Sequence, residues 1–140
     1  MSQTFSIQKS RELLNEQGYK TWIVEKPWNP YTKRREDLFN FIDLVGIREN
    51  RAGVIGIQAC GEDASEHTRK ILEGYVGSNG KHIGPNPYIG IWLKAGNPFF
   101  IWAWRLRGAK GKRKLYTLRE IEFVIKDGIV ATYENNVESV

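Results

Sequence analysis

The chain has 140 residues, of which 41% are hydrophobic and 26% are charged, and its formal net charge is +5. This length suits a single domain with a substantial core, and the composition is that of a soluble globular protein. The longest apolar runs fall far short of the roughly 18 residues that a membrane span needs. The single cysteine, Cys60, excludes an internal disulfide and a zinc site built on cysteines. The first residues lack the apolar core of a signal peptide, so we expect a cytoplasmic protein of a bacterial cell or a phage-infected host.

The hydrophobic pattern predicts one α/β domain over residues 1–140, with a mixed central β-sheet flanked by helices. A strand, a helix and a further strand in succession imply that part of the sheet is parallel. The 27–36 and 77–87 segments, rich in proline and glycine, are expected to be loops. The expected elements are a helix over 6–17, strands over 19–26, 38–47 and 54–60, a helix over 63–76 capped by Asp63 or Ser65, strands over 88–94 and 99–106, and a hairpin of 120–126 with 129–134 turning at Asp127-Gly128.

Two polar residues interrupt the apolar strands. Asp43 lies within FNFIDLVGI and Gln58 within VIGIQAC. A lone buried carboxylate is costly unless it is paired or holds a metal. Side chains alternate along a strand, so Gln58 and Cys60 share one face. If the two strands form a hairpin, Asp43 and Gln58 lie near one another at the end of the sheet, with the following helix covering one face.

Basic residues gather in two places, a pattern that suits phosphate contacts when aromatic residues lie beside them. The segment WAWRLRGAKGKRKLY is the larger cluster, and a solvated hairpin loop is the alternative interpretation because it contains glycines. The predicted nucleic-acid-binding residues are Lys33, Arg34, Arg35, Arg105, Arg107, Lys110, Lys112, Arg113 and Lys114.

These segments resemble the PD-(D/E)XK, or restriction-endonuclease-like, nuclease superfamily. The likeness is carried by VEKPWNP, RREDLFNFIDLVGI, VIGIQAC, HTRKI and a later tryptophan-rich strand pair, within roughly residues 20 to 107. It is nearest to a small group of phage and bacterial predicted nucleases, with archaeal Holliday-junction resolvases more distant. The resemblance implies Mg²⁺ or Mn²⁺ as cofactor, Asp43 as its first ligand, Gln58 as the second, and Cys60 at the position of the expected lysine.

Gln58 and Cys60 are therefore departures from the pattern. Gln58 replaces an acid, and an amide oxygen brings a metal no charge. Glu25, on the preceding strand, or Asp37, at the start of the Asp43 strand, can supply the missing carboxylate, and Glu12 on the first helix is a weaker candidate. For all three the alternative is ordinary surface charge.

The missing lysine has two candidate substitutes. Some members of the superfamily carry that lysine on the following helix, where Lys70 lies here. The helical wheel places Lys70 away from the apolar face, with His67 nearer its edge, and Lys70 can instead pair with Glu66. Lys94 is a second source of positive charge. No Cys–His pairing is apparent in the sequence, and a small buried residue is the ordinary role for Cys60.

The chemistry predicted from these features is metal-dependent hydrolysis of phosphodiester bonds, with Asp43, Gln58 and Lys70 as catalytic residues and DNA as the partner. Because of the two departures, a nuclease-like fold that only binds nucleic acid stays open. A structural or interaction protein of a phage or bacterial assembly, using the aromatic strands as an interface, is the third alternative. A homodimer is a further hypothesis, since resolvase-like proteins often pair.

Overall fold

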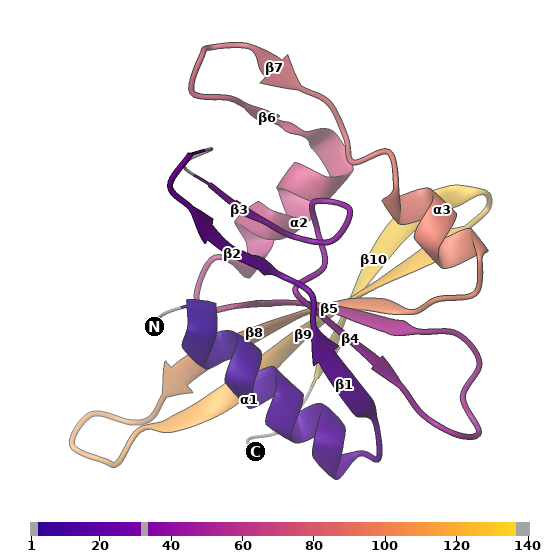
Figure 1. The fold of residues 1–140 in the computed structure, drawn as a ribbon. Helices are drawn as coiled ribbons and strands as arrows, with labels where there is room; N and C mark the ends of the chain where they lie inside the picture. The colour runs from indigo at the N-terminus through magenta and orange to yellow at the C-terminus, as the bar shows by residue number, and fades with distance from the viewer. Residues whose placement is uncertain (1–2, 32–33, 137–140) are drawn as a thin grey trace.

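The computed structural model describes residues 3–31 and 34–136 and contains a six-stranded mixed sheet with helices on both faces, which confirms the predicted α/β class (Figure 1). Two short two-stranded hairpins lie outside the main sheet. The elements, in chain order, are α1 (Gln3–Glu16), β1 (Lys20–Ile23), β2 (Lys26–Asn29), β3 (Arg34–Glu36), β4 (Leu44–Ile47), β5 (Ile55–Cys60), α2 (Ala64–Glu73), β6 (Tyr75–Val76), β7 (His82–Ile83), α3 (Ile89–Lys94), β8 (Phe99–Arg107), β9 (Leu115–Lys126) and β10 (Ile129–Asn136).

The main sheet has the strand order β1-β4-β5-β8-β9-β10. The predicted hairpin of β4 and β5 is confirmed, with Leu44 opposite Ile57. β5 and β8 are parallel, as the intervening α2 led us to expect, and the other neighbours in this sheet are antiparallel. The turn at Asp127-Gly128 joins β9 to β10, also as predicted.

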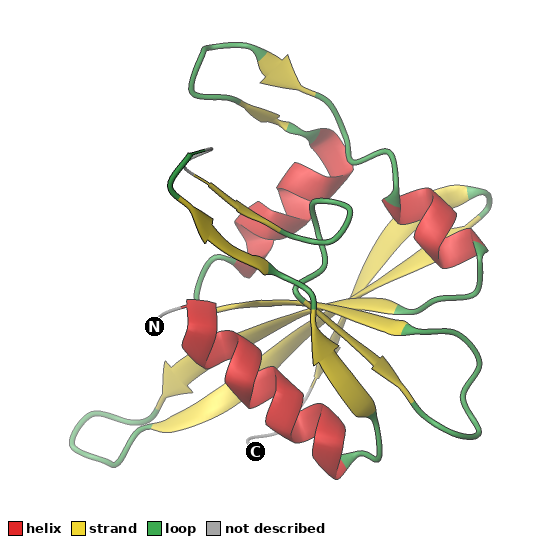
Figure 2. Cartoon of the chain, in the orientation of Figure 1, coloured by secondary structure: helices red, strands yellow, loops and turns green. Residues whose placement is uncertain are grey.

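The sheet separates two hydrophobic clusters. Figure 2 shows α1 against one face, with α2 and α3 on the other side. The α1 side contains Leu14, Ile57 and Trp104, and the indole N–H of Trp104 donates to the Ser10 hydroxyl at 2.8 Å. The opposite side contains Phe41, Cys60 and other buried residues packed against α2 and α3. Ile57 and Cys60 therefore point to opposite faces, as strand alternation predicts.

The prediction of a strand over 38–47 is wrong for residues 38–43, because β4 begins at Leu44. Residues 38–42 form a tight turn in which Phe39 and Asn40 have φ of 53° and 67°. Asparagine tolerates this left-handed region better than most residues, and local hydrogen bonds close the turn. The apolar residues Phe41 and Ile42 fill the core beneath α2 and α3, and an apolar run alone does not distinguish such a turn from a strand.

The strand predicted over 88–94 is also wrong, because Ile89–Lys94 is the short helix α3. The side-chain oxygen of Asn86 accepts hydrogen bonds from the backbone N–H groups of Tyr88 and Ile89, at 2.8 and 3.2 Å. These bonds satisfy N–H groups that a helix start leaves unpaired, which favours a helix despite the β-forming residues. The helix is followed by Gly96, with φ of 91°.

Four smaller expectations need correction. The 27–36 and 77–87 segments are not plain loops, since they contribute strands to the β2–β3 and β6–β7 hairpins. The helix α2 ends at Glu73, and Asp63 occupies its N-cap position without a side-chain cap hydrogen bond.

Among the described residues no helix is both long and apolar enough for a membrane span.

Candidate metal centre

Three carboxylates meet at one end of the main sheet. Glu25 follows β1, Asp37 follows β3 and Asp43 immediately precedes β4, and one oxygen of each lies within 4.8 Å of the others. The backbone fixes part of this arrangement, because the N–H groups of Val24 and Glu25 donate to the carbonyl of Asp43 at 2.9 and 3.2 Å. Oxygens bound to one Mg²⁺ at 2.0–2.1 Å are at most about 4.2 Å apart. Adjacent oxygens of an octahedral Mg²⁺ are about 2.9 Å apart, so the three side chains would have to move closer together to share one ion.

Asp43 is fully buried in this cluster. One of its oxygens, Oδ2, accepts a hydrogen bond from the backbone N–H of Ala59 at 2.9 Å, which ties the carboxylate to β5. Burial raises the pKa of Asp43 to about 9, repulsion from Asp37 and a hydrogen bond with it add to the shift, and Glu25 contributes less. Without a cation this carboxyl group therefore holds a proton at neutral pH, and a bound cation would favour its ionised form.

Gln58 lies on β5 beside this cluster and is 6% exposed. Its neighbours Ile57 and Ala59 belong to the α1-side core, so alternation directs Gln58 to the α2 side. Its amide oxygen, Oε1, is buried and has no hydrogen-bond partner among the described residues. Leaving a buried carbonyl oxygen unpaired costs about 1–3 kcal/mol, so an oxygen in this position suits a ligand that the protein atoms do not supply.

A cleft of about 640 Å³ is lined by Gln58, by Asp37 of the three acids and by residues of α2. Lys70 lines this cleft, and its Nζ lies 3.8 Å from Glu66 and 5.6 Å from the centre of the Tyr75 ring. The side chain of Lys70 is 42% exposed, so solvent reaches it. The lining residues are Glu36, Asp37, Asn40, Gln58, His67, Lys70, Ile71, Tyr75, Ile83, Gly84, Pro85, Asn86 and Pro87.

The structure thus brings together Glu25, Asp37 and Asp43, and joins Asp37, Gln58 and Lys70 through one cleft. The helical wheel correctly kept Lys70 off the apolar face of α2, whose buried residues are Ala64 and Ile71. Glu12 on α1 is exposed and belongs to neither group, and Lys94 at the end of α3 does not line the cleft.

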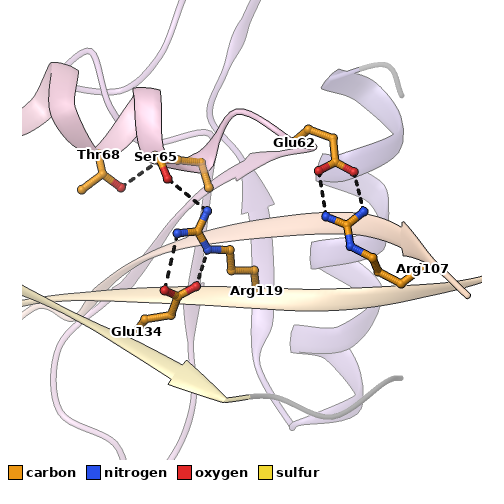
Figure 3. A network of polar contacts seen from close by, with 7 residues as sticks. Glu62, Ser65, Thr68, Arg107, Arg119 and Glu134 are labelled. Carbon is orange, nitrogen blue, oxygen red and sulfur yellow. Dashed lines mark hydrogen bonds and ion pairs between the residues drawn. The ribbon is translucent and has the colours of Figure 1, made fainter.

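The start of α2 is held in place by a polar network. Arg119 of β9 donates to Glu134 of β10 and, at 3.1 Å, to the hydroxyl of Ser65 (Figure 3). Ser65, expected as a possible cap, therefore serves to bind the helix to the sheet. This contact ties the start of the helix that carries Lys70 to β9, a strand of the same sheet as β5, which carries Gln58.

The predicted nucleic-acid-binding residues of the 105–114 segment fall into three situations. Arg107 donates to both oxygens of Glu62, at 2.9 and 3.0 Å, which lowers the pKa of Glu62 and compensates the charge of Arg107 (Figure 3). Arg105 is half-buried, with its Nε enclosed. The remaining basic residues of this cluster lie exposed in the β8–β9 connection: Lys110, Lys112, Arg113 and Lys114.

The second basic cluster is only partly covered by the structure. Lys33 lies outside the described residues. Arg34 and Arg35 form the start of β3, but their side chains lie outside what the structure describes. Of the two predicted clusters, the one whose side chains the structure describes is therefore the 105–114 segment, with its lysines exposed in the β8–β9 connection.

A second group of possible ligands was missed by sequence reasoning. One ligand atom each of Cys60, Asp63 and His67 lies within 4.8 Å of the others, although no Cys–His pairing was apparent from the sequence. The spacing Cys-x₂-Asp-x₃-His was the available signal. The β5–α2 turn brings the end of a strand beside the first turn of a helix, and only the fold reveals that proximity.

Comparison with known proteins identifies no relative: no family model matches this chain, and neither does any curated protein or solved structure. The functional assignment therefore rests on the residues and their geometry.

Proposed function

We propose that this protein is a metal-dependent nuclease that hydrolyses phosphodiester bonds of DNA. The observation that carries the proposal is the proximity of Glu25, Asp37 and the buried Asp43, each of which offers a carboxylate oxygen within 4.8 Å of the others. Hard oxygen ligands of this kind suit Mg²⁺ or Mn²⁺. The adjacent cleft, lined by Gln58 and Lys70, offers space for a phosphodiester beside the ion.

Each residue of the site has a chemical task in this proposal. The three carboxylates hold the ion, and the Gln58 amide oxygen is a neutral ligand. When bound, Mg²⁺ or Mn²⁺ supplies Lewis-acid chemistry and lowers the pKa of a coordinated water. Lys70 places a positive charge at the cleft, where it stabilises the negative charge that develops on the phosphate oxygens.

The order of elements supports the same proposal. A carboxylate on a strand, a turn, a second strand carrying a polar pair two residues apart, and then a helix is the layout on which the resemblance to PD-(D/E)XK nucleases was based. The order of β4, β5 and α2 follows it, with Asp43 directly before β4 rather than within the strand. Glu25 and Asp37 compensate for the first departure, the glutamine at position 58. Lys70 compensates for the second, the cysteine at position 60.

A binding protein without catalysis is the second candidate, and a specific observation favours it. Gln58 brings no charge, and Lys70 is already engaged with Glu66 and Tyr75. Incubation of labelled duplex, single-stranded and branched DNA with Mg²⁺, Mn²⁺ or EDTA separates the candidates. The proposal predicts cleavage with either metal and none with EDTA. Binding without cleavage under all conditions, or cleavage that persists in EDTA, would remove the metal-dependent nuclease assignment.

Lys70→Ala is expected to lower the rate of cleavage by about tenfold to a hundredfold with little change in stability. Loss of one group that stabilises the transition state typically costs this much or more, and the partial exposure of Lys70 places it at the lower end. Single-turnover cleavage rates measure the effect. Arg69→Ala is the matched control, because Arg69 is exposed on the same helix and does not line the cleft. Equal rates in the two variants would exclude Lys70 from the reaction.

The basic β8–β9 connection is expected to hold the DNA backbone. Replacing Lys110, Lys112 and Lys114 by glutamine should weaken binding and reduce the slope of log affinity against log salt by about 0.9 for each charge that contacts a phosphate. Fluorescence anisotropy at several salt concentrations measures this slope. Equivalent substitutions of the exposed Arg11, Lys20 and Lys126, on other elements, should change it less.

Absence of any salt-dependent affinity would favour the third alternative, a structural or interaction protein. In that case the aromatic strand is a poor interface, because Trp102 and Trp104 are 3% and 2% exposed. The proposed homodimer stays a separate hypothesis, which gel filtration with light scattering tests.

A further inference from the structure

The connection between β5 and α2 gathers three different metal-ligating side chains. Cys60 is the last residue of β5, Asp63 occupies the N-cap position of α2, and His67 lies one turn further along the helix. His67 Nε2 is 3.1 Å from Asp63 Oδ2, and the Cys60 sulfur lies within 4.8 Å of both ligand positions. The thiol is buried, whereas the side chains of His67 and Asp63 are 24% and 55% exposed. The group therefore has an inner sulfur ligand and an outer side open to solvent.

We propose that Cys60, Asp63 and His67 form a binding site for a zinc-class divalent ion, separate from the acidic cluster of Glu25, Asp37 and Asp43. Zinc binds Cys sulfur at about 2.3 Å, His nitrogen at about 2.0–2.1 Å and carboxylate oxygen at about 2.0–2.2 Å, usually in a tetrahedron. Those bond lengths place neighbouring ligand atoms about 3.3–3.6 Å apart. The observed Asp63–His67 separation is close to this range, and the sulfur needs a shift of about an ångström or less.

The donor set decides which ions the site prefers. Thiolate and imidazole ligands favour Zn²⁺ and Co²⁺, whereas the all-oxygen acidic cluster favours Mg²⁺ or Mn²⁺. The two groups are thus expected to select different metals within one protein. Three protein ligands leave the fourth tetrahedral position to water, on the solvent side where Asp63 and His67 are exposed.

A nucleophilic role explains the same residues less well. An activated cysteine needs a neighbouring cation or base and access to substrate. Cys60 is 2% exposed, and burial together with the negative charge of Asp63 raises the pKa of its thiol to about 12. A metal ion is the partner that converts such a thiol to the thiolate, since ligation displaces the proton.

Titration of the untagged, metal-free protein with Co²⁺ tests the site, with excess Mg²⁺ present to occupy the acidic cluster. We expect one equivalent of Co²⁺ to produce a thiolate-to-cobalt charge-transfer band in the near ultraviolet and the visible absorption of a four-coordinate ion. Added Zn²⁺ should displace the cobalt and remove both signals. Zn²⁺ should also raise the melting temperature, because it binds only the folded site.

Two variants and one matched control make the test specific. Cys60→Ser should abolish the charge-transfer band, and His67→Gln should weaken cobalt binding at least tenfold. His82→Gln should leave both unchanged, since His82 is the other histidine of the chain and is exposed on β7. The partly exposed His67 is expected to tolerate substitution, so this variant decides the question even if Cys60→Ser fails to fold.

The acidic cluster of the proposed nuclease site is tested separately from the zinc-class site. Asp37→Asn should weaken Mn²⁺ binding at the acidic cluster and leave the cobalt spectrum intact. Absence of a charge-transfer band in the wild-type protein, its persistence in Cys60→Ser, or equal cobalt affinity in His67→Gln and wild type would overturn the proposed zinc-class site.

Discussion

Asp43→Asn is expected to abolish metal-dependent cleavage while stabilising the metal-free protein at alkaline pH. The carboxylate is the buried member of the three-acid cluster, so the amide removes a charged ligand with almost no change in shape. A bound metal contributes several kcal/mol to transition-state stabilisation, which corresponds to a loss of about a thousandfold or more in rate. Cleavage rates at saturating Mg²⁺ and Mn²⁺ measure this part of the prediction.

The stability effect follows from the raised pKa of Asp43. Its folded-state value of about 9 lies above the ordinary 3.8, so the native protein retains a proton that the unfolded chain releases between these values. The contribution to the free energy of unfolding is greatest below about pH 4 and is lost as the pH rises through about 9. The slope from one such group is at most about 1.4 kcal/mol per pH unit.

Urea unfolding in EDTA between pH 5 and pH 9 tests this linkage. Wild type should lose stability with rising pH, Asp43→Asn should show a flatter dependence, and Mg²⁺ should reduce the loss in wild type because it stabilises the ionised carboxylate. Glu12→Gln is the control, since Glu12 is exposed on α1 outside the cluster. If Asp43→Asn had the pH dependence of wild type, the raised pKa of the buried carboxyl group would be contradicted.

Gln58→Glu is expected to strengthen metal binding and weaken the metal-free fold. The substitution replaces a buried, unpaired amide oxygen by a carboxylate beside the acidic cluster. In EDTA, confining another acid there should lower the free energy of unfolding by about 2–4 kcal/mol, even if the group is partly protonated. With Mg²⁺, the extra negative ligand should raise affinity by about tenfold or more and increase the cleavage rate.

Isothermal titration calorimetry with Mg²⁺, together with urea unfolding in EDTA, measures both parts of the Gln58 prediction. Gln58→Leu is the matched opposite, because it removes the amide oxygen without adding charge. We expect weaker Mg²⁺ binding in this variant and metal-free stability equal to or above that of wild type. If Gln58→Glu bound Mg²⁺ no better than wild type, Gln58 would not lie in the coordination sphere of the ion.

The part of the fold that was predictable from the sequence is the part with clear local signals. The short apolar run 54–60 lies between glycine-containing turns and the Asp127-Gly128 pair is a strong hairpin signal, and both predictions were confirmed. The segment 88–94 was misassigned because β-forming residues outweighed a single local signal, Asn86, whose side chain caps α3. Local hydrogen bonds of this kind override intrinsic propensity in short elements.

The candidate site was predictable in its members but not in its arrangement. Asp43 and Gln58 stood out because polar residues rarely interrupt buried apolar runs without a reason. Glu25 and Asp37 were offered as alternatives, and the structure places both beside Asp43, because the backbone N–H groups of Val24 and Glu25 bind the carbonyl of Asp43 and the turn at 38–42 joins Asp37 to Asp43. The meeting of these three acids depends on tertiary packing, and so does the meeting of Cys60 and His67. Neither follows from the spacing of the residues along the chain.

Anomalous scattering from a crystal soaked in Mn²⁺ shows whether the three acids bind a divalent ion. We expect a manganese peak bonded to carboxylate oxygens of Glu25, Asp37 and Asp43, within reach of the amide oxygen of Gln58, and no such peak in Asp43→Asn. A well-ordered site at which these carboxylates bind no manganese, or manganese bound only elsewhere on the protein, would contradict this expectation.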